Sequence, residues 1–270
     1  SGVYFDNRPL VGIPENKMIP FTENLAFHPC AKSLKNLYDK GKVAIIQGIG
    51  YENSSRSHFR AMDIWHTCEP NHVATEGWLA KVIREIDPNS SNPVTAVNFG
   101  RGLPRALSCK GVPVASVGDL ENYGLLPDIE GEQSRELALT AFSQIYGSAM
   151  AHDTVSQFIG ETGIQALKGA DILRTAPQKY SSSIEYGNDP IGQSMRNIAQ
   201  VLTADIGTRV FYTSHGSFDT HAAEMETHTK LWTETSNAIG DFMADMKEQG
   251  LEDDVLVLLW SEFGRRIRDN

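Results

Sequence analysis

The chain has 270 residues and carries 24 Lys and Arg against 34 Asp and Glu, which gives a formal net charge of −10. Hydrophobic residues make up 40% of the chain, enough for one large core or two small ones, so disorder is not expected. The acidic balance, without basic blocks, argues against nucleic acid as a partner, because Lys and Arg supply most of that affinity. The longest apolar run, Val255–Trp260, has the length of a strand and is too short for a membrane span.

The first part of the chain alternates helical and strand-like patterns. Apolar residues at helical spacing predict a helix over Pro29–Lys42, and the apolar run Val43–Ile49 that follows predicts a buried strand. Ser57 stands at the N-cap position of the next helix, because apolar residues recur at helical intervals behind it. The same reasoning predicts a helix over Gly77–Ile86 and, after a break rich in Pro, Asn and Ser, a strand over Val94–Phe99.

The middle of the chain is irregular at first and then helical. Arg101–Asp128 is rich in Gly and Pro with short β-like pieces, which predicts irregular structure and a small hairpin. Helices are expected over Gln133–Met150 and Asp153–Arg174, and a third surrounds the apolar stripe within Ile191–Leu202. Together these helices, at about residues 133–205, are expected to form a helical insertion or cover.

The C-terminal part has the most regular pattern. A strand is predicted at Arg209–Tyr212, a long helix at Ala222–Gln249 and an all-apolar strand at Val255–Trp260. This order predicts a βαβ unit and therefore a parallel sheet. The expected fold class is α/β, with a central, largely parallel sheet flanked by helices in one domain over residues 1–270. Because the chain begins at Ser1 and stops soon after the last strand, we expect it to be incomplete at both ends.

Cysteine usage points to no structural framework. Cys30, Cys68 and Cys109 are scattered and form no C-x-x-C pair. We interpret them as ordinary core or surface residues rather than as a zinc knuckle or a disulfide framework.

Reactive polar residues follow three of the predicted strands, and ligands of parallel sheets bind where the carboxyl ends of the strands meet. In the pair Asp219-x-His221, residues two apart in an extended segment point the same way, so a carboxylate oxygen and an imidazole nitrogen can reach one cation. The alternative is that Asp219 caps the following helix and His221 is an exposed residue of its first turn. His215 is either a further ligand or a loop residue.

Glu262 comes two residues after the last apolar run, where a charge needs a cation or hydrogen-bond donors to offset its desolvation. It is either a metal ligand or the partner of Arg265 in an ion pair that closes the strand end. In the first case Arg265 or Arg266 would hold an anionic substrate by a forked contact.

Ser57 and His58 form the third candidate group. Ser57 is either only the N-cap of its helix or a nucleophile, because amides at a helix start favour developing negative charge. For His58 three roles are open: it ligates a metal, it acts as a base, or it only packs against neighbouring side chains.

Three strings resemble, in the same order, the domain-of-unknown-function family numbered 1501: Ser55-Arg-Ser57-His58-Phe59, His215-Gly-Ser-Phe-Asp219-Thr-His221 and Ser261-Glu262-Phe-Gly-Arg265-Arg266. Arg8-Pro9-Leu10 and Phe27-His28-Pro29 extend the likeness over nearly the whole chain. The family is similar to the alkaline phosphatase and sulfatase superfamily, which implies a dinuclear metal site at the strand ends of the sheet. The resemblance implies that Ser57 is the nucleophile, that Asp219 and His221 are a metal pair, and that Glu262 is the acidic residue at a strand end.

The resemblance also carries expectations about ligands and location. Further ligands of the family lie in an upstream Gly-Gly-Asn-Asp-Gly segment and a downstream Gly-Thr-Asp-His-Gly segment, which are not in these 270 residues. Export by a twin-arginine signal is common in the family, which implies a periplasmic or secreted bacterial protein.

Two functional hypotheses follow. The first is a metal-dependent hydrolase of phosphate or sulfate esters that uses one or two divalent ions, zinc, manganese, magnesium or calcium, on a small anionic ester substrate. The second is a non-catalytic binding or structural protein of the cell envelope that keeps the same fold. A homo-oligomer or an envelope assembly is open under both.

Overall fold

The computed structural model describes residues 2–120, 123, 131–149, 154–264 and 266–269. Its contacts divide the chain into two compact units. Unit 1 comprises residues 1–61, 182–199 and 214–270, and unit 2 comprises residues 62–181 and 200–213.

Unit 2 contains a parallel sheet, which confirms the α/β class and the parallel pairing. Within the described part of the chain its order is β4 (Ala115–Val117), β3 (Ala96–Phe99) and β5 (Val210–Thr213), with Val97 opposite Ala115 on one side and Phe211 on the other. All four residues of β3 are buried, as expected for a central strand of a parallel sheet. The small hairpin predicted within Arg101–Asp128 is wrong in its described residues, because β4 pairs parallel to β3 after a crossover through a 3-10 turn, η2 (Arg105–Leu107).

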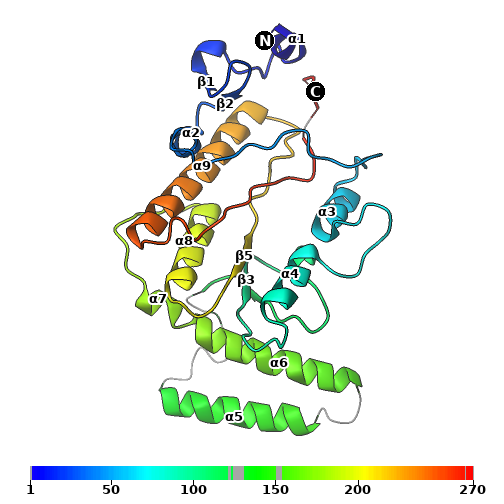
Figure 1. Cartoon of the computed structure of the whole chain (residues 1–270), viewed down its shortest axis with the longest axis vertical. Coiled ribbons are helices and arrows are strands. Elements are labelled where there is room, and N and C mark those ends of the chain that lie inside the picture. The colour runs from blue at the N-terminus through cyan, green and yellow to red at the C-terminus, as the bar shows by residue number, and fades with distance from the viewer. Residues whose placement is uncertain (1, 121–122, 124–130, 150–153, 265, 270) are drawn as a thin grey trace. The chain divides into compact units, whose positions relative to one another are not determined.

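Helices of unit 2 pack against the sheet and against each other. The core cluster joins Ile83 of α4 (Trp78–Ile86) to Ala96 of β3 and Leu107 of η2. Beyond it, α5 (Glu132–Ala149) and α6 (Thr154–Leu173) lie side by side (Figure 1) and share an ion pair from Arg135 to Asp171, with 2.6 Å between Nε and Oδ1. A short helix, α7 (Ala176–Lys179), follows them. The helices predicted near 77–86, 133–150 and 153–174 are confirmed over their described residues, whereas Met150 and Asp153 lie outside them.

Unit 1 is built around α9 (Glu224–Glu248), the predicted long helix, against which α2 (Lys32–Asp39) packs (Figure 1). The Leu34 N–H of α2 donates to Ser236 Oγ of α9 at 3.2 Å. Gly240 permits this close approach, because a Cβ atom there would lie 2.6 Å from Ser33 Cβ. Phe242 and Met246 turn inward from α9 and are buried.

The remaining elements are mostly short. Unit 1 begins with α1 (Gly2–Asn7), a 3-10 turn η1 (Glu15–Lys17), and the antiparallel pair β1 (Ile19–Pro20) and β2 (Ala26–Phe27). Two helices run from unit 1 into unit 2: α3 (His58–Thr67), which begins directly after Ser57 as predicted, and α8 (Pro190–Thr203), which carries the predicted stripe. Among the helices that the structure describes, none has the length and apolar character needed to cross a membrane.

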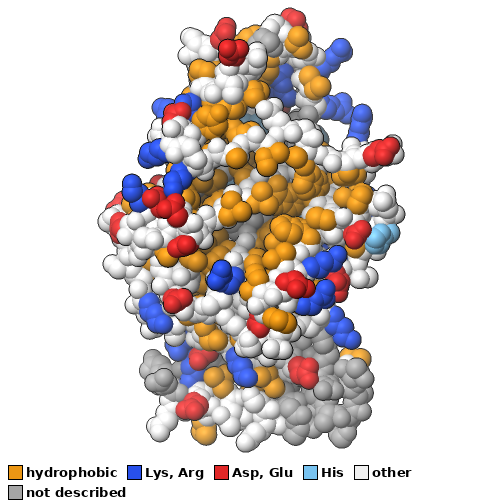
Figure 2. All heavy atoms as spheres, viewed as in Figure 1, with side chains coloured by type: hydrophobic (Ala, Val, Ile, Leu, Met, Phe, Trp, Pro, Cys, Tyr) orange, Lys and Arg blue, Asp and Glu red, His pale blue; other side chains and the backbone are white. Residues whose placement is uncertain are grey.

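Two predicted strands are wrong. Neither Val43–Ile49 nor Val255–Trp260 is a strand, although every residue of both runs is described. Their apolar side chains are largely exposed, with Ile46 at 74% and Leu256 at 94% (large exposed hydrophobic side chains are orange in Figure 2). The βαβ unit predicted from the last run is therefore absent from the described residues. Apolar composition favours burial, but a strand forms only where a neighbouring backbone completes its ladder.

Candidate active site around Asp219

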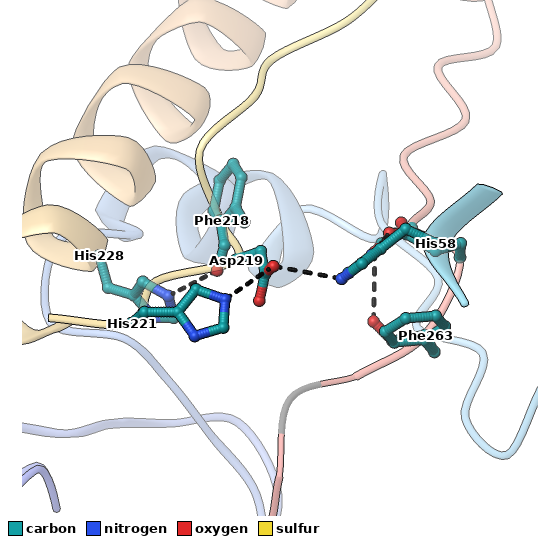
Figure 3. Close-up of polar contacts among 8 residues, drawn as sticks. His58, Phe218, Asp219, His221, His228 and Phe263 are labelled. Carbon is teal, nitrogen blue, oxygen red and sulfur yellow. Dashed lines mark hydrogen bonds and ion pairs between the residues drawn. The ribbon is translucent and has the colours of Figure 1, made fainter. Parts of the chain in front are cut away.

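Three segments of unit 1 that are distant in sequence bring reactive side chains to one place (Figure 3). His58 is the first residue of α3, Asp219 and His221 lie in the loop before α9, and Glu262 follows the apolar run that ends at Trp260. Thr220 between the pair is buried, whereas Asp219 and His221 are exposed. The segment is not extended as expected, because Thr220 N–H donates to the Phe218 carbonyl at 3.0 Å and closes a tight turn with Asp219 at its centre. The Asp219 and His221 side chains nevertheless lie together, with 3.1 Å between Oδ2 and Nε2.

The Asp219 carboxylate lies between two imidazole rings (Figure 3). Its Oδ2 atom is 3.2 Å from His58 Nε2 and 3.1 Å from His221 Nε2. The side chains are partly open to solvent, at 38% exposure for Asp219, 47% for His58 and 73% for His221. One oxygen and two nitrogens thus face each other at an accessible point of the surface.

Glu262 holds the other side of the His58 ring. Its Oε1 atom lies 2.7 Å from His58 Nδ1, its Oε2 atom accepts a hydrogen bond from Ser261 Oγ at 3.0 Å, and the ring of Phe263 lies 4.7 Å from the imidazole. Because a carboxylate only accepts, His58 Nδ1 carries the proton of the shorter contact. The ring of His58 is therefore fixed by a carboxylate and an aromatic side chain.

The electrostatics of this pair agree with its geometry. The hydrogen bond to Glu262, reinforced by the charge of Asp219, raises the pKa of His58 above its ordinary value despite partial desolvation. Burial alone would raise the pKa of Glu262, but the hydrogen bonds from His58, from its own backbone N–H and from Ser261 outweigh burial and lower it. The pair thus favours an ionised carboxylate next to a protonated imidazole.

The donor atoms at Asp219 are of the kinds that zinc and manganese accept, namely imidazole nitrogen and carboxylate oxygen. Their present arrangement is a row, with Asp219 in the middle, and no group of three or more His, Cys, Asp or Glu side chains in the described part of the chain surrounds a point where a metal could sit. The exposure of His221 leaves its side chain room to rotate. The donors fit a divalent ion in chemistry, and enclosing one requires a side-chain rotation.

The other candidate residues are placed as follows. The Ser57 carbonyl accepts the first helical hydrogen bond of α3, from Ala61 N–H at 2.9 Å, and Ser57 is exposed. Arg266 is also exposed, and its backbone carbonyl accepts a hydrogen bond from the Arg8 guanidinium at 2.6 Å. Arg265 lies outside the described residues, so its predicted roles have no structural counterpart.

His215 faces α9. Its Nε2 atom lies 3.3 Å from Glu234 Oε2, both side chains are 15% exposed, and the ring packs on Phe218 at 5.6 Å. These contacts place His215 at the base of the loop that carries Asp219, and its predicted role as a metal ligand stays a prediction.

Two residues that hold this loop, Phe218 and His228, were not predicted from the sequence. Phe218 packs between His228 and Trp232 of α9, and His228 also contacts the backbone of Phe218. The signal was present in the sequence, because His228 and Trp232 are four apart and therefore share one face of the helix, while Phe218 directly precedes the candidate Asp219.

The comparisons with known proteins identify a family. Residues 47–270 match the family described as "Protein of unknown function (DUF1501)", a match that includes His58, Asp219, His221 and Glu262. Neither a curated protein nor a solved structure matches the chain. The chain belongs to the DUF1501 family.

Proposed function

We propose that this chain is a metal-dependent hydrolase of phosphate or sulfate esters. The observation that carries the proposal is the Asp219 carboxylate, whose Oδ2 atom faces His58 Nε2 and His221 Nε2 at 3.2 and 3.1 Å. Paired imidazole nitrogens around one carboxylate oxygen are a donor set suited to zinc or manganese. A bound divalent ion supplies an electrophile that neutralises an anionic ester and lowers the pKa of a nearby hydroxyl or water.

In this proposal the side chains have distinct tasks. Asp219, His221 and His58 Nε2 hold the ion, and Glu262 acts behind His58, because both Glu262 oxygens are already engaged by His58 Nδ1 and Ser261. A carboxylate that accepts the second N–H of a ligating histidine fixes its tautomer and its ring orientation. This division refines the expectation that Glu262 itself is a ligand.

The substrate side of the site faces solvent. The Ser57 hydroxyl is exposed and directly precedes His58, a position suited to a nucleophile. Of the two arginines expected to bind substrate, Arg266 is described and is exposed, and its guanidinium would hold an anionic ester by a forked contact. With this activity we also propose the alkaline-phosphatase-like arrangement and the periplasmic or secreted location that the family resemblance implies.

Metal binding tests the proposal first. Isothermal titration of the metal-stripped chain with Zn²⁺ and with Mn²⁺ should give binding that Asp219→Asn weakens by more than about 100-fold. Glu262→Gln should weaken it by about 10-fold to 100-fold, because the amide oxygen still accepts from His58 Nδ1 while the charge is lost. Asp253→Asn is the matched control, since Asp253 is an exposed carboxylate of unit 1 that pairs with Lys42 at 2.7 Å.

Hydrolysis is the second readout. The metal-loaded chain should cleave an aryl phosphate or an aryl sulfate, and Ser57→Ala should abolish that cleavage with the metal affinity unchanged. Tight metal binding without cleavage of either ester would instead favour a non-catalytic binding protein of the cell envelope. No metal binding in the parent chain would reject the hydrolase.

A further inference from the structure

The loop that carries Asp219 and His221 has an unusual backbone. Ser217 and Ala223, at its two ends, have φ angles of +74° and +50°. These values lie in the left-handed region, which non-glycine residues avoid because Cβ crowds the backbone. A segment bounded by two such residues needs contacts elsewhere to hold its shape.

His228 of α9 supplies contacts on both sides of Asp219. Its Nε2 atom lies 3.2 Å from the carbonyl oxygen of Phe218 and 3.5 Å from the hydroxyl of Thr220. Because the carbonyl only accepts, Nε2 must carry the hydrogen in this contact. Figure 3 shows the His228 ring directed at the backbone oxygen of Phe218.

The side chain of Phe218 supplies the second anchor. Its ring lies 5.6 Å from the ring of Trp232 and 6.1 Å from that of His228, both on α9, and 5.6 Å from His215. The contacts with Trp232 and His215 are edge-to-face and that with His228 is tilted, and ring contacts at these separations are favourable. The ring therefore wedges the loop against α9 one residue before Asp219.

We propose that Phe218 and His228 are positioning residues that set the direction of the Asp219–His221 pair. The inference rests on the proposed function, because its consequence is metal affinity. Neither residue touches the ion. They hold residues 218 and 220 against α9, and the tight turn that Thr220 N–H closes on the Phe218 carbonyl at 3.0 Å leaves residues 219 and 221 on the exposed side.

Two measurements on the full chain test this inference. The first is amide hydrogen exchange of residues 217–222 in metal-free protein, which should accelerate about three- to tenfold in His228→Leu and in Phe218→Ala, as expected when one hydrogen bond or packing contact is lost. His228→Gln should restore slow exchange, because its amide N–H can donate to the Phe218 carbonyl. His72→Leu is the control, since the His72 side chain is 62% exposed and belongs to unit 2.

The second measurement is titration with Zn²⁺ alone. His228→Leu and Phe218→Ala should weaken Zn²⁺ binding about 10-fold to 100-fold, with His228→Gln and His72→Leu close to the parent. Unchanged exchange, or parent-like Zn²⁺ affinity in both variants, would overturn the positioning role and leave the proposed function standing. A parent chain that binds no Zn²⁺ or Mn²⁺ would overturn the proposed function and with it the role in metal binding, and the exchange data would then report the loop anchor alone.

Discussion

Two apolar runs of similar length differ in this chain: one is a buried strand and the other is exposed and unpaired among the described residues. Val94–Phe99 contains β3, whose four residues are buried between β4 and β5. Val255–Trp260 is more apolar, yet it forms no strand, and Leu256, Leu258 and Leu259 are 94%, 63% and 58% exposed. Hydrophobicity alone would rank the two runs in the reverse order.

The difference lies in the backbone partners. Val97 lies opposite Ala115 on one side and Phe211 on the other, so both edges of β3 are paired and both faces are covered. A strand gains its stability from cross-strand neighbours, and the same sequence without them keeps only its tendency to be extended. Figure 1 draws Val255–Trp260 as an extended trace, and no backbone ladder joins it to any described residue.

The largest effect is expected for a charge in the buried run. Val97→Asp should lower the free energy of unfolding by more than about 4 kcal/mol, because Val97 is fully buried and a carboxylate there would lose its hydration. Urea unfolding followed by circular dichroism measures the loss. Val97→Thr is the matched control, since it keeps the shape without a charge. A loss below about 1 kcal/mol for Val97→Asp would mean that β3 is not the buried central strand of the sheet.

The same contrast explains how far the sequence predicts the structure. Helical periodicity located α2, α4, α5, α6, α8 and α9 to within a few residues, because the apolar residues of each recur at intervals that mark one face of a helix. Val94–Phe99 and Arg209–Tyr212 were correctly assigned as strands, whereas Val43–Ile49 and Val255–Trp260 were not. Pairing depends on residues distant in sequence, and neither apolar composition nor strand length reports it.

At the site, residue type and spacing selected His58, Asp219, His221 and Glu262, which the structure brings together. The contacts among them were not predictable. That Glu262 binds the Nδ1 side of His58, leaving Nε2 for Asp219, depends on how three separate segments meet. The contact of His228 with the Phe218 carbonyl is a further example: the spacing of His228 and Trp232 marks a shared helix face, but it does not identify a backbone partner ten residues earlier.

A smaller effect should appear at the entrance to the buried strand, where Asp87 orders the turn before β3. The backbone N–H of Asn92 lowers the pKa of Asp87, with further hydrogen bonds from Ser91 and Thr95. A lowered pKa in the folded state means that the stabilisation is present above the ordinary carboxyl value of about 3.9 and is lost as pH falls through the lower folded value. Urea midpoints measured from pH 6 to pH 2.5 should therefore fall less steeply in Asp87→Asn than in the parent. An identical slope would mean that the turn does not depend on the charge of Asp87.

The smallest effect is expected in the exposed run. Leu258→Asp should change the free energy of unfolding by less than about 0.5 kcal/mol, because the side chain is 63% exposed and the new carboxylate stays hydrated. Leu256→Asp, at 94% exposure, is the companion variant, and both are read by the same urea unfolding as Val97→Asp. Equal, small losses would establish that apolar sequence without a ladder does not stabilise this fold. A loss of stability at Leu258 close to that at Val97 would show that residues 255–260 form a covered strand in solution. Glu262, two residues beyond that run, would then lie at a strand end, as its position in the sequence predicts.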